Sequence, residues 1–182
     1  MTVDREEASA LLSDVEGIES RVRQLLTYAS VSDYLFLWGT IWFFGFTANF
    51  FFRPFSGPLW LGLQIAGLLG TVLIVRSHVV QTQNWFVVAR AALSVLAIVG
   101  FGTFWSSLLD MGWREQVTFW PTFLSFLLFL FGLWVGRAMS FYALLLFALS
   151  LAGYYFAGEY LHLWMAIVVG GGMIAGGVWL RR

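Results

Sequence analysis

Residues 34–52 read YLFLWGTIWFFGFTANFFF and contain no charged side chain. About 20 mostly apolar residues are enough for an α-helix to cross the hydrocarbon core of a bilayer. A membrane β-strand would be about half as long and would alternate apolar with polar residues. The continuous apolar character of this segment therefore predicts a transmembrane helix.

Five further stretches of the chain have the same character, and charged or turn-forming residues such as Arg53 and Pro54 separate them. A helix satisfies its backbone hydrogen bonds internally, as the membrane interior requires. We predict an all-α, polytopic integral membrane protein, a bundle of six transmembrane helices occupying 34–182. Pro121 would lie in the first turn of the fourth helix, where proline is tolerated. The predicted spans are about 34–52, 57–75, 85–106, 118–136, 138–157 and 161–180.

The composition of the chain excludes several other classes of protein. Of 182 residues, 60% are hydrophobic and 11% are charged, about half the charged share of a soluble domain. The sequence contains no cysteine, and all ten basic residues are arginine. A soluble globular domain, a disulfide scaffold, a cysteine-ligated metal site and a lysine Schiff base are therefore excluded.

The predicted helices are joined by connections that lie alternately on the two sides of the membrane, and the arginines are concentrated on one side. In membrane proteins the arginine-rich side is the cytoplasmic one. We predict that both termini are cytoplasmic and that only Arg53 and Arg114 lie on the outer side. Arginine use without lysine suggests a bacterial protein, and we expect it in the inner membrane. The arginines on the cytoplasmic side would be Arg5, Arg21, Arg23, Arg76, Arg90, Arg137, Arg181 and Arg182.

Residues 1–33 form a polar tail before the first apolar segment. Its apolar residues repeat at the spacing of one face of a helix, which predicts an amphipathic cytoplasmic helix. The tail is acidic, so an anionic membrane surface would repel it. Three arrangements stay open: the helix binds a cytoplasmic protein, binds a second copy of the chain, or packs over the protein's own loops. The apolar stripe consists of Leu11, Val15, Ile18, Val22 and Leu25.

Few polar groups lie within the predicted spans. Arg90 would lie about 8 Å inside the third helix and, with Arg76 and His78, would make a candidate site for an anion or a lipid headgroup. The alternative is that Arg90 extends to the interface and that His78 belongs to an ordinary loop. Asn49 and Gln64 would lie at similar depth on neighbouring helices, so we predict a hydrogen bond between their amides.

Small residues four positions apart allow transmembrane helices to approach closely. On the second helix and the sixth helix such residues form ridges, which we expect to pack within the bundle. A subunit interface and a flexible gating helix are the alternatives. The ridges consist of Gly62, Ala66 and Gly70, and of Ala166, Gly170, Gly172 and Gly176.

No pattern of a known catalytic site is present, and no cluster of His, Asp and Glu offers a metal site. We therefore expect no enzyme activity, no metal, no cofactor and no nucleic-acid partner. The leading hypothesis is a membrane scaffold, accessory or regulatory subunit that contacts lipids and binds a partner or a second copy through its tail. The alternatives are a small channel or carrier for an apolar, lipid-like or anionic solute and, third, an enzyme acting on lipids.

Overall fold

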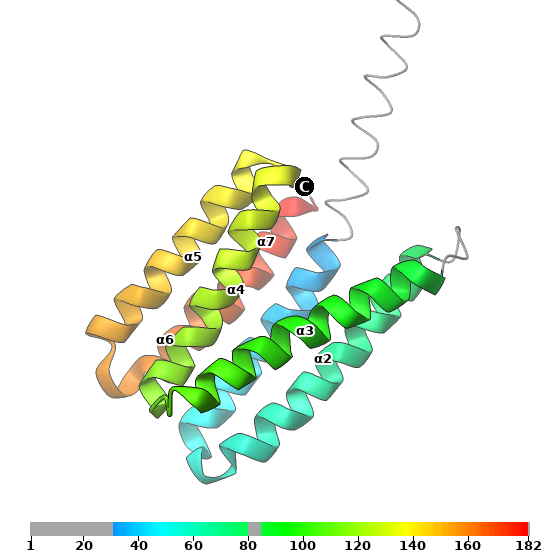
Figure 1. The fold of residues 1–182 in the computed structure, drawn as a ribbon. Helices are drawn as coiled ribbons and strands as arrows, with labels where there is room; N and C mark the ends of the chain where they lie inside the picture. The colour runs from blue at the N-terminus through cyan, green and yellow to red at the C-terminus, as the bar shows by residue number, and fades with distance from the viewer. Residues whose placement is uncertain (1–30, 80–84, 182) are drawn as a thin grey trace, which may run out of the picture.

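The structure is a computed structural model that describes residues 31–79 and 85–181. Over these ranges the chain is all-helical, and no β-strand occurs in them (Figure 1). The apolar stripe of the tail lies outside the described residues. Long helices run up and down the molecule and are joined by short connections.

The first described helix is Val31–Phe51. A short 3-10 helix, η1 (Arg53–Phe55), leads into α2 (Ser56–Val79), and α3 (Trp85–Leu108), α4 (Trp113–Val135) and α5 (Arg137–Phe156) follow. The last long helix begins with η2 (Gly158–Tyr160) and α6 (Leu161–Met165), passes through a π-helical segment (Ala166–Gly171) and ends with α7 (Gly172–Leu180).

Several of these helices have the length and composition of membrane spans. They are Val31–Phe51, Arg53–Arg76, Trp113–Trp134, Arg137–Phe156 and Gly158–Leu180, and α3 contributes a shorter apolar stretch, Ala92–Leu108. The prediction of an all-α protein with apolar helices of membrane-spanning length is thus confirmed.

The fourth helix begins earlier than the sequence pattern predicted. It starts at Trp113, so Pro121 lies in its interior rather than in its first turn. Residues 114–116 are polar, a pattern that is typical of a loop, but Glu115 in the first turn suits the positive end of a helix dipole. Asp110 adopts a left-handed conformation with φ 46°, and this residue separates α3 from α4.

We call the end of the bundle that carries Val31 and Leu180 the terminal end. The opposite end, with the η1 and η2 connections, is the loop end (Figure 1). Exposed tryptophan and tyrosine side chains occur near both ends, where interfacial aromatic residues of membrane proteins lie. They include Trp105, Trp113, Tyr155, Tyr160 and Trp164 at the loop end, and Trp134 and Trp179 at the terminal end.

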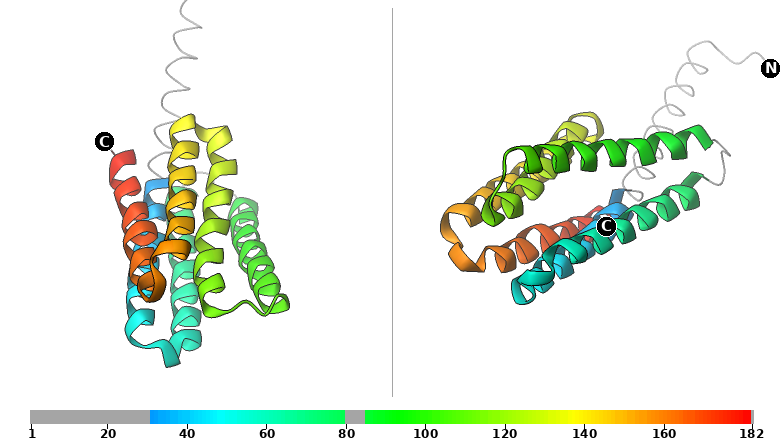
Figure 2. Two further views of the ribbon diagram at one scale, coloured as in Figure 1. Left: turned by 90° about the vertical axis from the view of Figure 1, so that its left-hand side faces the viewer. Right: turned by 60° about the horizontal axis from the view of Figure 1, so that its bottom comes forward.

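The core lies where the first helix packs against the last. Trp42, which is 2% exposed, makes edge-to-face contacts with Phe46 and Trp60 at centroid distances of 5.5 and 6.4 Å. Met165 and Val169 of the last helix belong to the same buried cluster. The two views in Figure 2 also place the first helix beside the last, although they lie at opposite ends of the sequence.

Glycine allows the backbones of these two helices to meet. A Cβ atom on Gly170 would lie 2.5 Å from the backbone nitrogen of Phe43, and one on Gly39 would lie 3.0 Å from the carbonyl oxygen of Gly170. The same helix faces α5 through Gly172 and Gly176, where a Cβ would approach Leu146 and Tyr142 to 3.0 and 2.9 Å.

The predicted ridge on α2 does not act as one surface. Gly70 faces Leu37 of the first helix, and a Cβ there would lie 2.8 Å from that side chain. Gly62 faces open space, and Ala66 is exposed. The residues of α2 that pack on the first helix instead include Gly67 against Trp38, whose indole Nε1 donates to Thr71 Oγ1 at 3.2 Å.

The α3 helix lies at the edge of the bundle (Figure 2). Of its residues whose exposure the structure describes, Gly102 and Ser106 are buried, and apolar residues such as Leu93 and Phe104 are exposed. An apolar cavity of about 170 Å³ lies between α2 and α3. It is lined by Leu68, Leu69, Thr71, Val72, Val75, Ala92, Val95 and Leu96.

Candidate functional site

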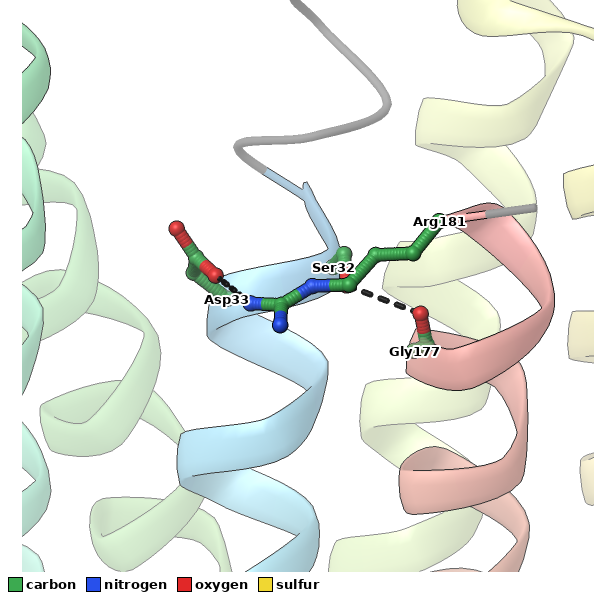
Figure 3. Close-up of polar contacts among 4 residues, drawn as sticks. All are labelled: Ser32, Asp33, Gly177 and Arg181. Carbon is green, nitrogen blue, oxygen red and sulfur yellow. Dashed lines mark hydrogen bonds and ion pairs between the residues drawn. The ribbon is translucent and has the colours of Figure 1, made fainter.

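A polar contact at the terminal end joins the start of the first helix to the end of α7. Figure 3 shows Ser32, Asp33, Gly177 and Arg181, which we call the terminal clasp. Ser32 is fully buried, and its hydroxyl donates to the carbonyl oxygen of Gly177 at 2.8 Å. Arg181 Nε donates to the same hydroxyl oxygen at 3.0 Å, and its Nη2 forms an ion pair with Asp33.

Glycine at position 177 makes this contact possible. A Cβ there would lie 3.2 Å from both the carbonyl oxygen of Ser32 and the ring of Phe36. The guanidinium of Arg181 lies over the same ring, 4.7 Å from its centroid. The ion pair is partly exposed and worth no more than about 1 kcal/mol. The buried Ser32 hydrogen bond and the close helix contact therefore carry most of the stability of the clasp.

A second polar group occupies the loop end, and Trp113 lies at its centre. The imidazole of His162 stacks on the Trp113 ring at a centroid distance of 5.3 Å and an angle of 9°. The guanidinium carbons of Arg53 and Arg114 lie 5.2 and 6.0 Å from the same ring. With Asn49, these residues form what we call the Trp113 cluster.

The cluster brings together the first helix, η1, α4 and α6. Asn49 Nδ2 lies 2.9 Å from His162 Nε2. If the amide donates, as the assigned atoms imply, the imidazole proton is on Nδ1. The histidine and the asparagine are 2% and 5% exposed, so this bond lies in the protein interior.

Tyr154 of α5 closes one side of the cluster. Arg114 Nη2 donates to the carbonyl oxygen of Tyr154 at 2.6 Å, and the guanidinium carbon lies 5.3 Å from the tyrosine ring centroid. The Tyr154 hydroxyl donates to Glu115 Oε1 at 3.2 Å. The single nearby carboxylate in these contacts is therefore bonded to tyrosine rather than to either arginine.

Three buried polar atoms in the cluster have no hydrogen-bond partner. They are Asn49 Oδ1, His162 Nδ1 and Arg114 Nε. A buried polar atom without a partner costs about 1–3 kcal/mol. The Trp113 cluster therefore has two unused donors, Arg114 Nε and the protonated His162 Nδ1, and one unused acceptor, Asn49 Oδ1.

The predicted Asn49–Gln64 hydrogen bond is wrong. Asn49 pairs with His162, and both Asn49 Oδ1 and Gln64 Oε1 lack a partner. The reason is that Asn49 faces α6, which carries His162 at this depth. Asn49 and His162 both lie about one turn or less from the loop-end limits of their helices, and this equal depth is a signal that the sequence already carried.

The residues of the predicted anion site lie where α2 ends and α3 begins, and they belong to neither the terminal clasp nor the Trp113 cluster. Arg76 and Arg90 are both exposed, near the end of α2 and the start of α3. His78 lies in the last turn of α2. The cavity between α2 and α3 is not lined by Arg90, because helical spacing places that residue about 160° around the helix from Ala92. Arg53 and Arg114, which the sequence predicted only as arginines of the outer side, both approach the Trp113 ring instead.

The described residues contain no group of three or more His, Asp or Glu side chains that could hold a metal ion. Comparison with known proteins gives no further guide: no family model, curated protein or solved structure matches the chain.

Proposed function

We propose that this protein is a non-enzymatic membrane scaffold or accessory subunit whose tail, residues 1–33, binds a cytoplasmic partner protein or a second copy of the chain. In this proposal all six long helices cross a bacterial inner membrane and both termini are cytoplasmic. The acidic amphipathic pattern of the tail motivates the choice of a protein over an anionic lipid surface.

The observation that carries the proposal is the terminal clasp. It holds Ser32 and Asp33, the last residues of the tail region, against Gly177 and Arg181 of α7. We propose that this fixed attachment point places the apolar stripe beside the terminal end of the bundle. A partner bound to the stripe is then held at the membrane in a defined position.

Affinity capture from membranes tests this proposal with three forms of the protein: the full chain, a chain lacking residues 1–30, and the clasp variant Arg181→Gln. Arg137→Gln is the matched control, because Arg137 is an exposed arginine at the same end. We expect the partner or the larger oligomer to be lost without residues 1–30 and retained in the control. Arg181→Gln should reduce capture by a few-fold at most, because the ion pair that it removes is worth no more than about 1 kcal/mol. The same captured protein and the same oligomer size without residues 1–30 would contradict the proposal.

A small channel or carrier is the second candidate function. The π-helical segment Ala166–Gly171 favours it, since π-helical turns in α-helices often lie at functional sites. Solute flux into liposomes, measured for the wild type, Arg90→Ala and Gly172→Leu, tests it. Flux that Gly172→Leu abolishes would support this candidate. No flux for apolar and anionic solutes alike would leave the scaffold proposal in place.

A further inference from the structure

We propose that the Trp113 cluster binds the phosphate group of an anionic lipid headgroup at the loop end of the bundle. Tail binding plays no part in this inference, which concerns the opposite end of the molecule. It starts from the convergence of two guanidinium groups, Arg53 from η1 and Arg114 from α4, on one indole ring.

Within residues 31–79 and 85–181, neither Arg53 nor Arg114 forms an ion pair. The ion pair found there is that of Arg181 with Asp33, in the terminal clasp. Arg114 uses one nitrogen on the Tyr154 carbonyl, and its Nε is buried without a partner. Arg53 is exposed, so a ligand can reach its guanidinium from outside the bundle. Two guanidinium groups beside one indole ring make this a cationic site, and such a site attracts an anion.

Phosphate matches the donors that the cluster offers. Guanidinium groups bind phosphate oxygens through paired, charge-assisted hydrogen bonds. His162 Nδ1 is a further donor without a partner when Asn49 donates to Nε2. Stacking on Trp113 holds the guanidinium groups and the imidazole in place before a ligand arrives, which lowers the entropic cost of binding.

The position of the cluster favours a lipid as the source of the phosphate. Exposed aromatic residues, including Trp113 and Tyr160, surround the loop end, and such residues lie at headgroup level in membranes. Glu115, the nearby carboxylate, accepts a hydrogen bond from Tyr154.

Native mass spectrometry of the purified full chain tests the site. Phosphatidylglycerol, phosphatidylcholine and inorganic phosphate are titrated separately. We expect phosphatidylglycerol to bind at least tenfold more tightly than phosphatidylcholine. In Arg53→Gln/Arg114→Gln this affinity should fall at least tenfold, because the variant loses the charge-assisted hydrogen bonds from both guanidinium groups to the phosphate. Arg76→Gln/Arg137→Gln removes the same charge from exposed arginines elsewhere and should bind like the wild type.

Because Arg114 is partly buried, Arg53→Gln alone is a second variant that leaves the bundle interior intact, and a severalfold loss of affinity is expected. Helical circular dichroism confirms that each variant is folded. Binding of inorganic phosphate that the double variant abolishes would support the phosphate site and assign it to the free ion. Equal binding of phosphatidylglycerol by the double variant and its control, or equal binding of both lipids together with no phosphate binding by the wild type, would overturn the proposal.

Discussion

His162 is 2% exposed, and its described polar contact is the hydrogen bond with Asn49. At the scale of single residues, this pair shows how the bundle places polar groups: in pairs near its ends, with neighbouring atoms left unsatisfied. The terminal clasp also joins polar groups near an end of the bundle, but there the buried Ser32 hydroxyl is satisfied by the Gly177 carbonyl oxygen. Both pairs join helices that are far apart in the sequence, so they fix which helices are neighbours.

The corrected pairing of Asn49 can be measured with double-mutant cycles. Asn49→Leu and His162→Phe, alone and together, should show a coupling energy of about 0.6–1.7 kcal/mol, the range found for interhelical hydrogen bonds in membranes. Asn49→Leu with Gln64→Leu should show none, because these amides do not bond. SDS-induced unfolding in mixed micelles supplies the free energies. A coupling confined to Asn49 and Gln64 would restore the pairing first predicted.

At the scale of helices, the apolar runs and their separators predicted where the long helices lie. They did not reveal where α4 begins, because its polar first turn has the composition of a loop. Glu115 lies in that turn, where its negative charge suits the positive end of the helix dipole. They also did not reveal which helices touch. The contact of Gly170 with Phe43 and the convergence of Arg53 and Arg114 on Trp113 join distant parts of the chain, and spacing along one helix carries no information on such pairs.

Two glycine substitutions separate close packing from helix propensity. Gly170→Ala places a methyl group 2.5 Å from the backbone nitrogen of Phe43 and should destabilise the bundle by about 1–3 kcal/mol through overpacking. Gly62→Ala meets open space and should be neutral or stabilise by up to about 1 kcal/mol. Unfolding of both variants under the same conditions gives the comparison. Equal effects would mean that the first and last helices do not meet at Gly170.

At the scale of the whole molecule, charge is confined to the tail and to the ends of the bundle. The ten acidic and ten basic residues balance in total, but acids dominate the tail, and arginines lie at the helix ends. The two ends of the described bundle also differ: one carries the terminal clasp, and the other carries the Trp113 cluster. The proposed topology places these two groups on opposite sides of the membrane.

Labelling of introduced cysteines tests that topology, and the cysteine-free sequence makes single substitutions sufficient. Phe55→Cys and Glu159→Cys lie in exposed connections at the loop end. In intact cells they should react with a membrane-impermeant maleimide. Ser20→Cys in the tail and Ala138→Cys at the start of α5 should react only after permeabilisation. Labelling of all four in intact cells, or the reverse pattern, would contradict the proposed orientation.

The most direct test of the proposed function is photo-crosslinking from the tail in living cells. A photoreactive residue is placed at Val15 or Val22, which lie on the apolar stripe, or at Ser13 or Ser20, which lie about 200° around a helix from stripe positions. The scaffold account predicts a crosslinked protein of one defined mass, either a partner or a second copy, from Val15 and Val22 only. Crosslinks to lipid or within the same chain, or equal yields from both faces, would contradict it.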